Sequence, residues 1–112
     1  MASVSNLAID QGTTYETQIQ VNDDTGSARN LVGYTVRGQL RRSYYSSNSV
    51  TWTAQINAPS EGEVTISLSA AQTANLKPGR YVYDIELVAN ATSAVERLIE
   101  GIVTVYPEVT KV

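Results

Sequence analysis

The fold is decided by the stretch from Ser69 to Pro107, which reads Ser69-Ala-Ala-Gln-Thr-Ala-Asn-Leu76, Lys77-Pro-Gly-Arg80, Tyr81-Val-Tyr-Asp-Ile-Glu-Leu-Val88 and, after a loop of small residues, Val95-Glu-Arg-Leu-Ile-Glu-Gly-Ile-Val-Thr-Val-Tyr-Pro107. Ser69 is a favourable helix N-cap with Gln72 three residues on, so a short helix should begin there and end at Pro78-Gly79. Apolar and polar residues then alternate through two runs, which predicts two strands. A helical turn followed by a hairpin is how an antiparallel β-sandwich crosses from one sheet to the other and closes.

Alternation of the same kind predicts five earlier strands, close to residues 7–9, 14–22, 34–43, 50–56 and 64–68. Clusters of turn-forming residues separate them, among them Asp23-Asp-Thr-Gly-Ser27 and Asn57-Ala-Pro-Ser-Glu-Gly62. About seven short strands divided by such turns predict an all-β fold. We expect one antiparallel immunoglobulin-like β-sandwich domain over residues 1–112, with one short helical turn.

The alternation also assigns side chains to the core. In the run from Val50 to Ile56, Trp52 lies on the apolar face and should anchor the two sheets to each other. In the last strand, Arg97 falls on the same face as Ile99, Gly101, Val103 and Val105. Tyr81 follows the Pro-Gly corner, and its hydroxyl should bond backbone upstream, as in a tyrosine corner.

Composition excludes several classes of function. The formal net charge is −3, whereas nucleic-acid binders usually present a basic face. No apolar run approaches the roughly 20 residues that a membrane-spanning helix needs. The chain has no Cys, so it has no disulfides or thiolate metal sites, and its start lacks the features of a signal peptide. We therefore expect synthesis in a reducing cytoplasm, with neither nucleic acid nor a membrane as partner.

Candidate catalytic and metal-binding residues are few, because His is absent as well as Cys. Asp84 and Glu86 share one face of a strand, as a pair of glycosidase carboxylates might, but the favoured interpretation pairs them across the hairpin with Arg80 or Arg97. The acidic cluster at Asp23 lacks the ligand pattern of a calcium loop and is better explained as a turn. We expect no enzyme activity, no cofactor and no metal site.

Three tyrosines are the candidate partner-contact residues: Tyr44, Tyr45 and Tyr106. The pair Tyr44-Tyr45 lies in a loop rich in Ser and Asn, where it would serve as a protein contact or as a stacking platform for a base or a sugar. Tyr106 begins the segment Tyr106-Pro-Glu-Val-Thr-Lys-Val112, which is able to extend as an added strand. The start of the chain near Leu7 is a further contact element.

Several of these segments resemble one family. They are Ser5-Asn-Leu-Ala-Ile-Asp-Gln-Gly-Thr-Thr-Tyr15, Asn30-Leu-Val-Gly-Tyr-Thr35 with Arg37-Gly-Gln-Leu-Arg41, Pro78-Gly-Arg-Tyr-Val-Tyr-Asp84 and Arg97-Leu-Ile-Glu-Gly-Ile-Val-Thr-Val105. The family comprises small virion-associated structural proteins of tailed bacteriophages, particularly contractile-tailed cyanophages. The same plan is similar to the N-terminal domain of upper baseplate proteins. The resemblance covers nearly the whole chain, and its motifs are fold motifs without catalytic content.

The resemblance implies a non-enzymatic virion structural protein, made in the host cytoplasm and built into a tail, a baseplate or a fibre attachment. Its partners would be other virion proteins, in a homo-oligomer or in many copies per particle. Two alternatives are a capsid decoration protein and a carbohydrate- or host-surface-binding β-sandwich module. The carbohydrate hypothesis predicts that Trp52 is accessible to solvent.

Overall fold

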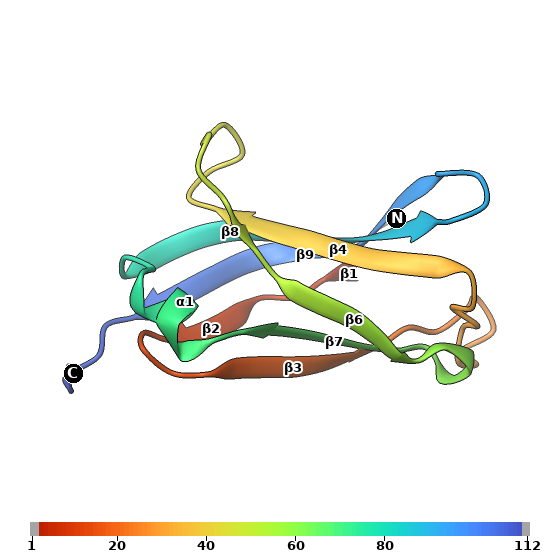
Figure 1. Cartoon of the computed structure of the whole chain (residues 1–112), viewed down its shortest axis with the longest axis horizontal. Coiled ribbons are helices and arrows are strands. Elements are labelled where there is room, and N and C mark those ends of the chain that lie inside the picture. Colours follow the sequence, from red (N-terminus) through yellow and green to blue (C-terminus); the bar gives the residue numbers. More distant parts are fainter. Residues whose placement is uncertain (1–2, 111–112) are drawn as a thin grey trace.

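A computed structural model describes residues 3–110 of the chain as two packed sheets (Figure 1). The larger sheet has six strands in the order β1-β9-β8-β4-β5, with β2 also paired to β9, and the smaller sheet has three in the order β3-β7-β6. The elements are β1 (Ser3–Val4), β2 (Leu7–Asp10), β3 (Tyr15–Gln20), β4 (Tyr34–Arg41), β5 (Val50–Thr51), β6 (Thr53–Ala58), η1 (Pro59–Glu61), β7 (Glu63–Leu68), α1 (Ala70–Ala74), β8 (Gly79–Ala89) and β9 (Val95–Tyr106). The expected immunoglobulin-like sandwich is confirmed.

The crossing between the sheets follows the sequence prediction. Ser69 and Gln72 form a capping box, in which the Ser69 hydroxyl accepts from the Gln72 amide and the Gln72 side chain accepts from the Ser69 amide. Helix α1 then carries the chain from β7 in the smaller sheet to β8 in the larger one (Figure 1). The helix ends earlier than expected, with Asn75 as its C-cap rather than at Pro78, because the Asn75 amide already closes the last turn onto Gln72 and Thr73.

The described residues form nine strands rather than about seven, because one expected strand is divided and the short strand β1 precedes the expected opening strand. The run 50–56 breaks at Trp52: β5 pairs with β4 in the larger sheet, and β6 pairs with β7 in the smaller one. The Trp52 amide marks the crossing by donating to the Gly38 carbonyl at 3.0 Å. Alternation of side chains continues through such a crossing, so the pattern alone did not reveal it.

The opening segment corrects the expectation of a purely antiparallel fold. Strands β1 and β2 both pair with β9 in parallel, in registers that place Ser3 beside Ile99 and Leu7 beside Val103. Between them the Asn6 side chain accepts a hydrogen bond from the Ile102 amide at 3.1 Å, which fills the gap in the ladder. Period-two alternation is the same in parallel and antiparallel strands and does not distinguish them.

The position predicted for Arg97 is wrong, because β9 contains a bulge. Ile85 pairs with Ile99 and Glu86 with Arg97, so Leu98 is an extra residue in the ladder. A bulge shifts the alternation by one residue on one side of it. Arg97 consequently lies on the outer face, away from Ile99 and the core.

The core lies between the two sheets and is centred on Trp52, as predicted. Trp52 is 3% exposed, and its ring centroid lies 6.0 Å from that of Tyr15 and 5.9 Å from that of Tyr83. Gly38 leaves room for the indole, since a Cβ built there would lie 3.2 Å from Trp52 Cδ1 and 2.4 Å from the Asp84 carbonyl oxygen. The tyrosine corner is also confirmed: the Tyr81 hydroxyl donates to the Lys77 carbonyl at 2.8 Å.

Candidate functional site

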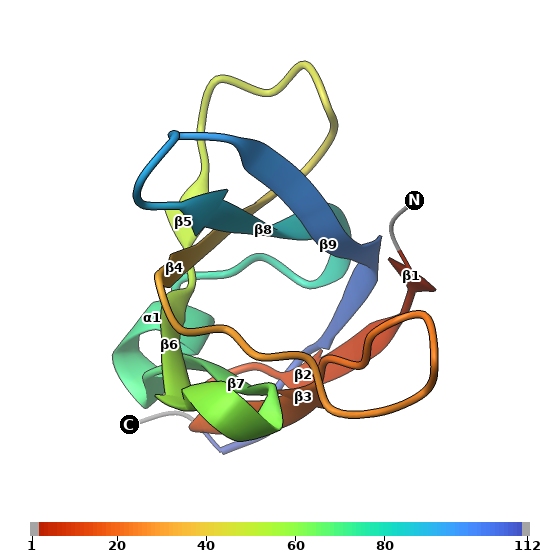
Figure 2. The same ribbon diagram turned by 90° about the vertical axis from the view of Figure 1, so that its right-hand side faces the viewer.

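The outer face of the larger sheet is hollowed into an open groove of about 580 Å³. Most of the residues that line it belong to β4, β8 and β9. The loop between β4 and β5 extends beyond these strands (Figure 2). Six charged side chains line much of it, together with Tyr44 from the loop after β4: Arg37, Arg41, Asp84, Glu86, Arg97 and Glu100. Because strands alternate, these residues face away from the core that their neighbours fill.

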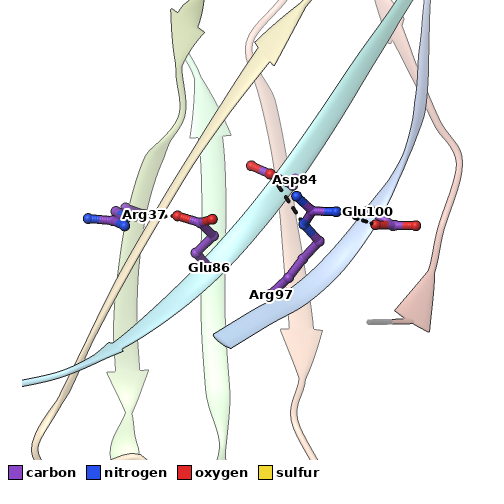
Figure 3. A network of polar contacts seen from close by, with 5 residues as sticks. All are labelled: Arg37, Asp84, Glu86, Arg97 and Glu100. Carbon is purple, nitrogen blue, oxygen red and sulfur yellow. Dashed lines mark hydrogen bonds and ion pairs between the residues drawn. The ribbon is translucent and has the colours of Figure 1, made fainter. Parts of the chain in front are cut away.

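The charges in the groove neutralise one another (Figure 3). Arg37 Nε lies 2.9 Å from Glu86 Oε1, which joins β4 to β8. Arg97 lies 3.5 Å from Asp84 Oδ2 and 2.9 Å from Glu100 Oε2, which ties β9 to β8. Two separate groups of ion pairs, Arg37 with Glu86 and Arg97 with Asp84 and Glu100, therefore join the three strands.

The expected pairing of Asp84 with Arg97 is confirmed, whereas Arg80 takes part in none of the ion pairs found in residues 3–110. The partner of Glu86 is Arg37, which the sequence did not identify, since the register of β4 on β8 is a non-local property. Partial burial raises the pKa of Asp84, with a further contribution from nearby Glu86, against the lowering effect of Arg97. Both carboxylates thus have cationic partners.

The loop after β4 presents the first two candidate contact residues. Arg41 holds its base, donating to the Ser46 carbonyl at 2.7 Å and to Gln39 Oε1 at 2.9 Å. Tyr44 and Tyr45 are 74% and 97% exposed, and Tyr44 also lines the groove. The arrangement displays two phenol rings on a loop whose base is fixed.

The other candidate contact elements are not part of the groove. Tyr106 is 52% exposed at the end of β9, opposite Asp10, and neither it nor Tyr45 lines the groove. Residues 107–110 form no strand; the rest of the tail expected to add as a strand, Lys111 and Val112, lies outside the described residues. Leu7 already pairs with β9 of its own chain.

Several alternatives lose support from the geometry. Burial of Trp52 contradicts the accessibility that the carbohydrate hypothesis required of it. The Asp23 cluster is a turn, in which Asp23 Oδ1 accepts from the Thr25 amide, the Thr25 hydroxyl and the Ser27 amide. Among residues 3–110, acidic side chains do not gather in the groups of three or more that a metal ion requires. No helix in that range is both long enough and apolar enough to cross a bilayer.

Comparison with known proteins shows the fold alone. Neither a protein-family model nor a curated protein sequence matches the chain. Among solved structures, InlP of Listeria monocytogenes is similar with a TM-score of 0.51 and 22% identity, over 91% of this chain and 26% of InlP. The chain therefore spans about a quarter of the length of InlP.

Two further structures have lower scores. The NK cell receptor NKp44 has a TM-score of 0.49 and 11% identity, over 95% of this chain and 99% of its own. A family 123 glycoside hydrolase from Clostridium perfringens has a TM-score of 0.45 and 14% identity, over 97% of this chain and 24% of its own. At these identities the likeness is one of architecture.

Proposed function

We propose that this chain is a non-enzymatic structural protein of a phage virion, in the tail, the baseplate or a fibre attachment, and that it acts through protein–protein contacts. The virion assignment rests on the sequence motifs described above. The mode of action rests on one structural observation: two highly exposed tyrosines stand on a loop whose base is held by Arg41.

Exposed tyrosines of this kind suit protein recognition. Tyr offers a large apolar surface with a polar tip and loses little conformational freedom on binding, so it is enriched in interfaces. A loop that is already held by hydrogen bonds loses less entropy when a partner docks. Tyr44 and Tyr45 would thus supply the centre of the contact, and the groove beside Tyr44 would supply its polar rim.

The groove suits a protein partner better than an anionic or sugar ligand. Two of the three arginines that line the groove, Arg37 and Arg97, are already paired with carboxylates at 3.5 Å or less. The third, Arg41, is held by the Ser46 carbonyl and Gln39 Oε1, and the three arginines are balanced by the three groove carboxylates, which leaves little net positive charge for a phosphate. The described residues also place the one tryptophan in the core, so the face lacks an indole platform for a sugar ring. A protein surface of mixed charge complements paired charges without leaving any of them buried and alone.

The test begins with purified particles of the phage that encodes the chain. Mass spectrometry of those particles should detect the chain in stoichiometric amounts. Particles assembled without it should take up added protein, whereas a Tyr44→Ser/Tyr45→Ser double variant should fail to incorporate. The control is Val32→Ser, which removes a 66% exposed apolar side chain just before β4, at the other end of that strand. Repeated absence of the chain from particles would refute the virion assignment, and normal incorporation of the double variant would refute the contact site.

A further inference from the structure

Strand β3 forms a sheet edge that is both long and regular, with no strand of residues 3–110 paired along its other side. At the other edges β1 and β5 have two residues each, β2 has four, and β6 carries a register shift between Ile56 and Ala58. The six residues of β3, Tyr15–Gln20, pair with β7 without interruption and include no Pro, Lys or Arg. Natural proteins usually protect exposed edges by shortening, bulging or charging them, because a bare edge pairs with other chains.

The alternation of hydrogen-bonded and non-bonded pairs between β3 and β7 shows which peptide groups of β3 do not bond to β7. The Val21 amide donates to the Gly62 carbonyl at 2.8 Å, which continues the β3–β7 ladder by one pair. In antiparallel strands hydrogen-bonded pairs alternate with non-bonded ones, so the odd-numbered residues of β3 bond to β7. The peptide groups of Glu16, Gln18 and Gln20 therefore point away from β7, toward the open side of the sheet.

The side chains indicate that this edge is incompletely covered. The inward-facing Thr17 and Ile19 are only half-buried, although their partners on β7, Ile66 and Val64, are fully buried. A strand placed beside β3 would cover Thr17 and Ile19. On the outer face Gln18 and its even-numbered neighbours are exposed and would meet the polar face of such a strand.

We propose that β3 pairs antiparallel with β3 of a second copy of this chain, about a twofold axis at Gln18. This register places Glu16 of each copy opposite the uncharged Gln20 of the other. It keeps the two Glu16 carboxylates, the only charges on the strand, roughly 13 Å apart, beyond the Debye length of about 8 Å at physiological salt. An axis at Glu16 would place those carboxylates face to face, and an axis at Gln20 would run past the end of the strand. Charge and strand length together select Gln18.

The second copy would extend the smaller sheet to β6-β7-β3-β3-β7-β6. The contact is independent of the proposed virion role, because β3 and the Tyr44-Tyr45 loop lie on opposite sides of the molecule (Figures 1 and 2). One strand edge buries less than the roughly 1,200 Å² of a standard interface, so the pairing is weak and depends on concentration. Many copies held side by side would strengthen it through effective concentration.

Hydrogen exchange measured by NMR on the unaltered chain, across about a hundredfold range of protein concentration, tests the proposal. The Glu16, Gln18 and Gln20 amides should slow about tenfold once nine-tenths of the chains are paired, because exchange proceeds from the unpaired fraction. The Thr17 and Ile19 amides, already bonded to β7, should change little. The proposal is overturned if the exchange rates of the three even-numbered amides do not depend on protein concentration. It is also overturned if those rates fall only when a different protein is added.

A cross-linking experiment tests the register. The chain has no Cys, so one introduced thiol reports one contact. A hydrogen-bonded antiparallel pair holds its Cα atoms about 5.5 Å apart, a separation that a disulfide accepts. Gln18→Cys should form a disulfide dimer at least about tenfold faster than Gln55→Cys, a matched exposed position on β6 at the other edge of the same sheet. Equal rates would overturn the Gln18-centred register.

Discussion

Replacing Trp52 tests the core on which every other element depends. The indole is 3% exposed between Tyr15 and Tyr83, and its Nε1 has no hydrogen-bond partner among the described residues. Truncating a buried Trp to Ala generally costs about 3–5 kcal/mol, whereas a buried donor without a partner already costs about 1–3 kcal/mol that the substitution removes. With about 1 kcal/mol taken for the unpartnered donor, Trp52→Ala should lower the free energy of unfolding by about 2–4 kcal/mol. Trp52→Phe keeps a ring and removes the N–H, so it should cost no more than about 1 kcal/mol.

Urea unfolding followed by far-UV circular dichroism measures both variants, since each removes the chain's only tryptophan and with it the fluorescence signal. With a slope of about 2 kcal/mol per molar urea, the midpoint of Trp52→Ala should fall by roughly 1–2 M. In the unaltered chain, acrylamide should quench the indole poorly. A midpoint shift below about 0.5 M for Trp52→Ala, or an equal loss for Trp52→Phe, would refute this account of the core.

Five further substitutions probe particular contacts. Tyr83→Phe and Tyr81→Phe should each lower the free energy of unfolding by about 1 kcal/mol, because each removes one hydroxyl hydrogen bond. The Tyr83 hydroxyl donates to the Ser5 carbonyl at 2.6 Å, so only Tyr83→Phe should speed hydrogen exchange in β1 and β2. Gly38→Ala should cost at least about 1–3 kcal/mol in urea unfolding, because its Cβ would lie 2.4 Å from a backbone oxygen of β8. The pKa of Asp84 is raised in the folded chain, so the contribution of Asp84 to the free energy of unfolding is present in acid and is lost as pH rises through that pKa. The hydrogen bond from Arg29 lowers the pKa of Glu96, so the contribution of Glu96 is present at neutral pH and is lost as pH falls through that pKa. Stability measured against pH should therefore change with opposite signs in Asp84→Asn and Glu96→Gln, and changes of the same sign would contradict the assignment.

Local patterns in the sequence predicted most of the fold. The capping box at Ser69, the turn at Asp23 and the tyrosine corner at Tyr81 each involve residues within four positions of one another. Both partners of each hydrogen bond lie in one short segment, so spacing is enough to predict them. The burial of Trp52 was also predicted, because alternation in a strand is a property of a single segment.

Features that depend on pairing between distant segments were not predicted. The parallel pairing of Leu7 with Val103 and the ion pair of Arg37 with Glu86 each join residues far apart in the sequence. Nothing within either segment specifies its neighbour or its register. The exposure of Tyr44 and Tyr45 agrees with their proposed contact role. The hydrogen bond from Arg41 that fixes their loop was not predicted, because its acceptor is the backbone carbonyl of Ser46 and any residue carries such a carbonyl.

The bulge at Leu98 links these non-local features to the proposed contact site. In a regular ladder Leu98 would lie beside Glu86 on the outer face, and Arg97 would lie beside Leu87 on the core side, where a cation without a partner is costly. One extra residue brings Arg97 to the outer face instead, where it pairs with Asp84. The groove becomes a set of matched charges, and this leaves the loop tyrosines as the uncompensated apolar surface beside it. The bulge therefore leaves the loop tyrosines as the part of this face whose apolar surface a partner would bury.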